Sequence, residues 1–146
     1  MEIVLVLLAL AAGAGLPVQA SLNAALARHA GRPEWLALVN FAVGLVALAA
    51  WLAALRLAPP PVLALSRAPW WSWAGGLLGA FYVSAITFLA PRLGVTETLA
   101  LAVGGQMVAA LAFDQLGALG LEIRPVTPSR LAGAALLVVA VVLIRR

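Results

Sequence analysis

Five long apolar runs, separated by short polar breaks, constrain this chain more than any other feature. They cover residues 2–27, 34–55, 69–90, 95–116 and 128–146. A helix needs about 20 mostly apolar residues to cross the ~30 Å hydrocarbon core of a bilayer, and each run is close to that length. Only helices and closed barrels satisfy all their backbone polar groups inside lipid. We therefore predict an all-α, polytopic membrane protein with five transmembrane helices in a single domain, 1–146.

The composition supports insertion into a lipid bilayer and argues against several classes of function. Hydrophobic residues make up 65% of the chain, against about 45–50% in ordinary soluble domains. The net charge of +4 comes from nine basic residues, all of them arginine, which stand in ones and twos and form no patch for nucleic acid. There is no cysteine, and the one histidine, His29, stands beside Arg28 at a helix end. We expect no enzyme activity, no metal and no cofactor.

The first apolar run is interrupted by a stripe of small and polar residues. Gly15, Gln19 and Asn23 recur every fourth residue, so they share one face of a helix. Amides within a bilayer must face protein or water, because lipid offers them no partner. Two interpretations stay open. The stripe is either a close contact between helices, with amides bonded across it, or part of a substrate path.

Two later runs carry further amides at depth. Asn40 lies in the second run, and Gln106 lies near the middle of the fourth, next to two glycines. Together with Gln19 and Asn23 these are neutral donors and acceptors, which suit a polar organic solute better than a bare ion. We predict that the four residues bind substrate, with Gln19, Asn23 and Gln106 facing one shared cavity.

Two acidic residues of the fourth run are candidates for proton coupling. Glu97 lies near the start of the run, where the helix dipole alone would explain a carboxylate. Asp114 lies one to two turns from the end of the run, deeper than a simple surface charge. It could pair with an arginine, accept hydrogen bonds at the helix end or exchange a proton. We predict Asp114 as the better coupling site and keep Glu97 as the second.

Other residues predict how the helices start, bend and pack. Pro17 removes one backbone hydrogen bond and is expected to kink the first helix, and with Gly15 it marks a packing surface. Gly75 and Gly79 have the four-residue spacing that lets helices approach closely. The stretch 91–94 indicates a tight break. Thr127 and the proline after it predict the start of the last helix.

Several of these motifs resemble one family of membrane proteins. They are Gly-Leu-Pro-Val-Gln-Ala-Ser-Leu-Asn-Ala-Ala-Leu at 15–26, Asn-Phe-Ala-Val-Gly at 40–44, and the stretches 69–80 and 91–94, with Gly105-Gln106, Asp114 and Gly117. In order and over essentially the whole chain, they resemble the YdcZ family of the drug/metabolite transporter (DMT) superfamily. The resemblance implies a multi-pass protein of the bacterial inner membrane, classed as an exporter, with no settled substrate. Ten-helix members of the superfamily look like two inverted five-helix halves, and this chain would be one half.

The resemblance also implies a function, with one departure. The small multidrug transporters of the superfamily carry a glutamate within the first helix, where this chain has only Gln19 and Asn23 at depth. Proton-coupled cation exchange therefore cannot be carried over. We expect a secondary transporter subunit that exports a small polar or organic molecule by alternating access in a dimer. The alternative is a structural or regulatory membrane subunit that transports nothing.

The arginines predict how such a subunit assembles. With five crossings, one side of the membrane carries five arginines and the other carries four: Arg28, Arg32, Arg92, Arg145 and Arg146 against Arg56, Arg67, Arg124 and Arg130. The bias of Lys and Arg in short loops sets orientation, and a difference of one sets little preference. We therefore predict dual topology and an antiparallel homodimer, with pairing to an oppositely oriented homologue as the alternative.

Overall fold

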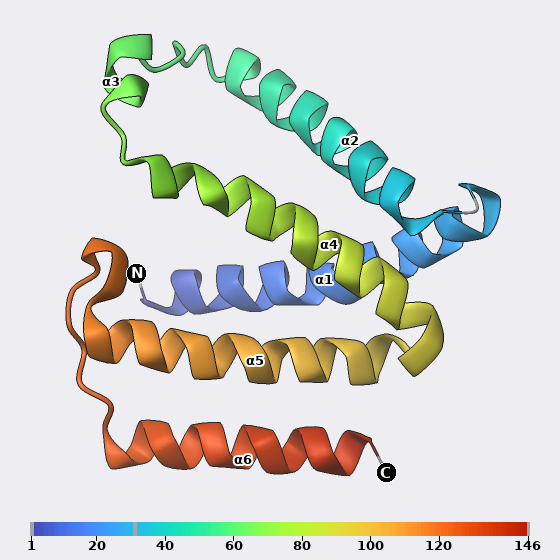
Figure 1. Ribbon diagram of the computed structural model, residues 1–146, viewed down its shortest axis with the longest axis vertical. Coiled ribbons are helices and arrows are strands. Elements are labelled where there is room, and N and C mark those ends of the chain that lie inside the picture. The colour runs from blue at the N-terminus through green and yellow to red at the C-terminus, as the bar shows by residue number, and fades with distance from the viewer. Residues whose placement is uncertain (1, 31, 146) are drawn as a thin grey trace. The chain divides into compact units, whose positions relative to one another are not determined.

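The computed structural model describes residues 2–30 and 32–145, and its regular structure is helical throughout (Figure 1). In chain order the elements are α1 (Glu2–Ala30), α2 (Pro33–Ala54), α3 (Val62–Ser66), η1 (Trp70–Trp73), α4 (Ala74–Leu93), α5 (Val95–Leu116), η2 (Ala118–Gly120) and α6 (Pro128–Ile144). The all-α prediction is therefore confirmed for the described residues.

Four helical segments are long and apolar enough to cross a membrane. They are Glu2–His29, Trp35–Ala54, Trp70–Leu93 and Val95–Leu116. The helix α6 is also apolar but has 17 residues, about 25 Å of helix, which is the lower limit for a bilayer crossing. The chain is thus a helical, multi-pass membrane protein, and its fifth crossing stays a prediction.

Two helices run further than the sequence predicted. The helix α4 continues through Pro91 to Leu93, because a proline removes one hydrogen bond without forbidding helical dihedrals in a last turn. The break that we placed at 91–94 is therefore wrong except at Gly94, whose φ of 85° is one that glycine adopts readily. The helix α1 continues to Ala30, and the ring of His29 donates to the Ala25 carbonyl near its end, at 3.2 Å.

The chain divides into two compact units, and the boundary in α1 falls at Pro17. One unit joins the residues up to Pro17 with those from Arg92 onward, and the other is Val18–Pro91. Pro17 lies inside α1, which stays one helix on both sides of it. The single domain over 1–146 stays a prediction.

In the first unit, α5 and α6 form an antiparallel hairpin (Figure 1). An ion pair joins the two helices at each end. Arg145 Nε lies 2.8 Å from Glu97 Oε1, where α5 begins and α6 ends. Arg130 Nη1 lies 3.1 Å from Asp114 Oδ2, where α5 ends and α6 begins. The two pairs fix the register of the hairpin, since a shift by one turn would separate both.

The connection between α5 and α6 folds back over the end of α5. The backbone N–H of Arg124 donates to the Asp114 carbonyl at 2.8 Å, and that of Val126 donates to Gln115 Oε1 at 2.8 Å. The last carbonyls of a helix have no partner within it, so the first bond satisfies one of them. Thr127 then begins α6, its hydroxyl accepting from the Arg130 N–H at 3.3 Å, as predicted.

In Val18–Pro91 the buried residues gather at one end of the helices. They lie late in α1, early in α2 and late in α4: Ala20, Asn23, Leu36, Ala37, Ile86, Thr87 and Ala90. Elsewhere large apolar side chains such as Val46 and Leu77 are exposed. In a membrane protein lipid covers such surfaces, so exposure of leucine here indicates the bilayer rather than instability.

Candidate functional site

A cavity of about 490 Å³ lies among the helices of Val18–Pro91. Gln19 of α1, Asn40 and Gly44 of α2, and Val83 of α4 line it. The rest of its wall comes from apolar residues of α2: Phe41, Val43, Leu45, Ala47 and Leu48. Asn40–Leu48 and Val83 fall near the middle of α2 and α4, so the cavity lies well inside the spans.

The two amides are the polar groups of this otherwise apolar wall. Gln19 and Asn40 are both half-buried, and each offers two N–H donors and one carbonyl acceptor. They come from two different helices, α1 and α2, and both line this one cavity. Leaving a buried polar group unpaired costs about 1–3 kcal/mol, and a solute that bonds both amides would recover part of that cost.

Two hydroxyl groups of α4 have no hydrogen-bond partner among the described residues. They are Tyr82 OH and Thr87 Oγ1, and both atoms are buried. Thr87 stands four residues after Val83, so it shares the cavity-lining face of α4 one turn further on. Sequence reasoning selected neither residue. The available signal was the presence of hydroxyl side chains one to two turns apart in an apolar run.

The structure brings together two of the four predicted substrate-binding residues. Gln19 and Asn40 line one cavity. Asn23 is 7% exposed and follows Gln19 by one turn of α1. Gln106 is exposed on α5, in the other unit. A cavity shared by Gln19, Asn23 and Gln106 stays a prediction, as does the binding role of all four.

Both predicted coupling residues are in ion pairs between α5 and α6. The Asp114 side chain is 36% exposed and the Glu97 side chain is 21% exposed. Asp114 is two residues from the end of α5, so it lies less deep than the sequence predicted. Pairing with an arginine was one of the three roles predicted for Asp114, and Arg130 is that arginine. Proton coupling by either residue stays a prediction. Within the described part of the chain, no three His, Cys, Asp or Glu side chains gather where they could hold a metal.

The predicted packing residues differ in their surroundings. A Cβ at Gly79 would lie 3.6 Å from the ring of Phe41, so α4 lies close to α2 there. A Cβ at Gly15 or Gly75 would meet nothing within 4 Å. Helix packing at Gly15 or Gly75 therefore requires a partner surface that the described residues do not supply at those positions. The packing role of both glycines, like that of Pro17, stays a prediction.

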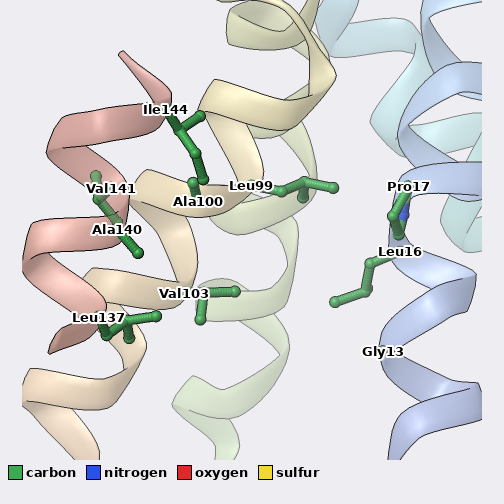
Figure 2. A pocket seen from close by; sticks show the side chains of 10 residues that line it. All are labelled: Gly13, Leu16, Pro17, Leu99, Ala100, Val103, Leu137, Ala140, Val141 and Ile144. Atoms are coloured by element: carbon green, nitrogen blue, oxygen red, sulfur yellow. The ribbon is translucent and has the colours of Figure 1, made fainter. Parts of the chain in front are cut away.

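A second cavity, of about 320 Å³, lies in the first unit and has no polar side chain in its wall. Gly13, Leu16 and Pro17 of α1 line it together with apolar residues of α5 and α6 (Figure 2). Because proline has no N–H, the Gly13 carbonyl lacks its usual helical partner. An all-apolar wall gives a polar solute nothing to bind, so the cavity with Gln19 and Asn40 is the better candidate site.

Four helices that are long and apolar enough to cross a membrane define a multi-pass membrane protein, and three of them, α1, α2 and α4, line a cavity with two amide side chains. A comparison with protein-family models identifies the family to which the chain belongs. The model of the family described as "Putative inner membrane exporter, YdcZ" matches residues 4–143. The chain belongs to this family and is a multi-pass protein of the bacterial inner membrane. No similar protein was found among curated proteins, and none among solved structures.

Proposed function

We propose that this protein is a secondary transporter subunit that exports a small polar organic molecule and binds it between Gln19 and Asn40. The observation that carries the proposal is the meeting of these two amides in one cavity near the middle of α2 and α4. Polar groups within a membrane span are candidates for a functional site by default. Neutral amides favour a solute with hydrogen-bonding groups over a bare ion.

A fifth crossing by α6 is part of the proposal. The two ion pairs hold α6 against α5 at both ends. From Glu97 to Asp114 the helix rises about 26 Å, and from Arg130 to Arg145 about 22 Å. Both lengths approach the ~30 Å hydrocarbon core, so α6 crosses wherever α5 crosses. Five crossings make the chain one half of an inverted ten-helix transporter.

The second half, in this proposal, is another copy of the chain in the opposite orientation. Five helices enclose too little volume to surround a pathway. Gln106 exposes an amide in mid-span, and Gly104 and Gly105 line a neighbouring groove of about 570 Å³ on α5 and α6. Lipid would leave that amide unpaired, whereas a partner helix could bond it. Alternating access then proceeds by rocking of the two halves around the polar cavity.

A binding screen tests the function. Purified protein is heated with a panel of metabolites and cationic drugs, and a bound ligand raises the unfolding midpoint. We expect Gln19→Leu to abolish the response to a ligand that stabilises the natural protein. Ser21→Leu is the matched control, because it makes the same kind of change two residues away at an exposed position.

The outcomes distinguish ligand binding at the cavity from a role of Gln19 in helix packing. A response lost in Gln19→Leu and kept in Ser21→Leu supports the cavity as the binding site. A response kept in both variants refutes it. If the Gln19→Leu protein no longer folds while Ser21→Leu does, the amide serves helix packing and the non-transporting alternative gains.

A further inference from the structure

A third cavity, of about 400 Å³, lies at the end of the α5–α6 hairpin where Asp114 pairs with Arg130. Both charged residues line it, and the remaining wall is apolar: Met107, Ala110, Leu111, Gly133, Ala134 and Leu137. Asp114 is two residues from the end of α5, and Arg130 is in the first turn of α6. The charges therefore stand where a membrane span reaches the headgroup region, with an apolar slot leading inward from them.

The slot continues beyond this cavity. Leu137 also lines the apolar cavity of Figure 2, whose wall includes Val103 and Leu99 further along α5. From Asp114 to Val103 the helix rises about 16 Å, and from Asp114 to Leu99 about 22 Å. One leaflet of the ~30 Å hydrocarbon core is about 15 Å thick. The groove is thus long enough for a full acyl chain that starts at the ion pair.

The ion pair still has bonding capacity to offer. The single contact uses Nη1 of Arg130 and Oδ2 of Asp114, which leaves other guanidinium N–H groups and the second carboxylate oxygen for a ligand. The two side chains are 39% and 36% exposed. A purely anionic head at Arg130 would be repelled by Asp114, and a purely cationic head at Asp114 would be repelled by Arg130. A headgroup that carries both charges completes an alternating cluster of four charges with Asp114 and Arg130.

We infer that this groove binds a zwitterionic phospholipid. Its phosphate contacts Arg130, its primary ammonium contacts Asp114, and one acyl chain follows the slot to Leu137 and beyond. The lipid is a structural ligand of the α5–α6 hairpin. The inference is independent of the polar cavity in Val18–Pro91 and of what the protein exports.

Delipidated protein tests the inference by native mass spectrometry and by the unfolding midpoint with added lipid. The probes are phosphatidylethanolamine and phosphatidylglycerol with identical acyl chains. We expect phosphatidylethanolamine to bind roughly threefold more tightly, since one partly exposed charge contact, that of the ammonium with Asp114, distinguishes the headgroups. Equal binding of the two lipids, or tighter binding of phosphatidylglycerol, would overturn the inference.

Two pairs of variants locate the site. A Cβ at Gly133 meets nothing within 4 Å, so Gly133→Leu can fold and fills the groove; it should remove the bound lipid. Gly75→Leu, which is equally open in the other unit, should not. Asp114→Asn should abolish the headgroup preference, and Glu97→Gln at the opposite ion pair should keep it. Lipid binding that survives Gly133→Leu, or a headgroup preference that survives Asp114→Asn, would refute the site.

Discussion

Replacing Gly117 with alanine should weaken the hairpin that carries Asp114 and Arg130. Gly117 ends α5 in the left-handed conformation, with φ 57° and ψ 31°. A residue with a side chain pays about 1–2 kcal/mol to adopt it. An added Cβ would also lie 2.6 Å from Ile123 Cγ1 and 3.1 Å from the Leu121 carbonyl oxygen. Moving Ile123 off its rotamer costs about another 1 kcal/mol.

The expected loss is therefore about 2–3 kcal/mol of unfolding free energy for Gly117→Ala. The measurement is a reversible unfolding titration of the purified protein in mixed micelles. Gly105→Ala is the matched control, because its Cβ has open space within the same helix, and it should be neutral or stabilising by up to ~1 kcal/mol. Adding Ile123→Ala to Gly117→Ala should restore about 1 kcal/mol, the part due to the clash.

Two outcomes would contradict this prediction. If Gly117→Ala is no less stable than Gly105→Ala, the left-handed turn does not hold the loop over α5. If the double variant regains nothing, Ile123 is not the obstacle.

Two further predictions concern the unpaired hydroxyl of α4 and the assembly. Thr87→Val should stabilise the protein by up to ~1 kcal/mol in the same titration, because it removes a buried hydroxyl without a partner. Thr96→Val, at an exposed position, should change the stability little. A clear loss of stability in Thr87→Val would show that the hydroxyl is bonded. Reporter fusions after residue 146 should show large populations on both sides of the inner membrane, because the arginines of the two sides differ by one; a single orientation in cells without any homologue would rule out the inverted homodimer.

The sequence predicts most of the helices because each apolar run is bounded by residues that stop a helix. The limits of α5 were predicted fully, since Gly94 and Gly117 both take positive φ at its ends. Past Pro91 the prediction fails, because the sequence does not show how the last turn of α4 tolerates a proline.

The sequence shows which residue types could form the candidate site, but not which of these residues lie together. Gln19 and Asn40 are visible as amides in apolar runs, yet their meeting depends on how α1 is rotated against α2. Glu97 and Arg145 are 48 residues apart, and only the antiparallel register of α5 and α6 makes them partners. Tyr82 and Thr87 were not selected, because buried hydroxyl groups usually find a hydrogen-bond partner and the lack of one appears only in the structure.

The central claim is that a polar solute reaches the cavity at Gln19 and Asn40, and cysteine accessibility tests it most directly. The chain contains no cysteine, so each single-cysteine variant reports one position. Asn40→Cys lines the cavity, whereas Val46→Cys lies on the same helix, 68% exposed on a surface that lipid covers. Both are treated with a charged, membrane-impermeant maleimide in sealed membrane vesicles of each orientation. A thiol reacts as the thiolate, which forms in water and not in hydrocarbon. We predict that Asn40→Cys is labelled and Val46→Cys is not; an Asn40→Cys variant as inert as Val46→Cys from both sides would contradict the account.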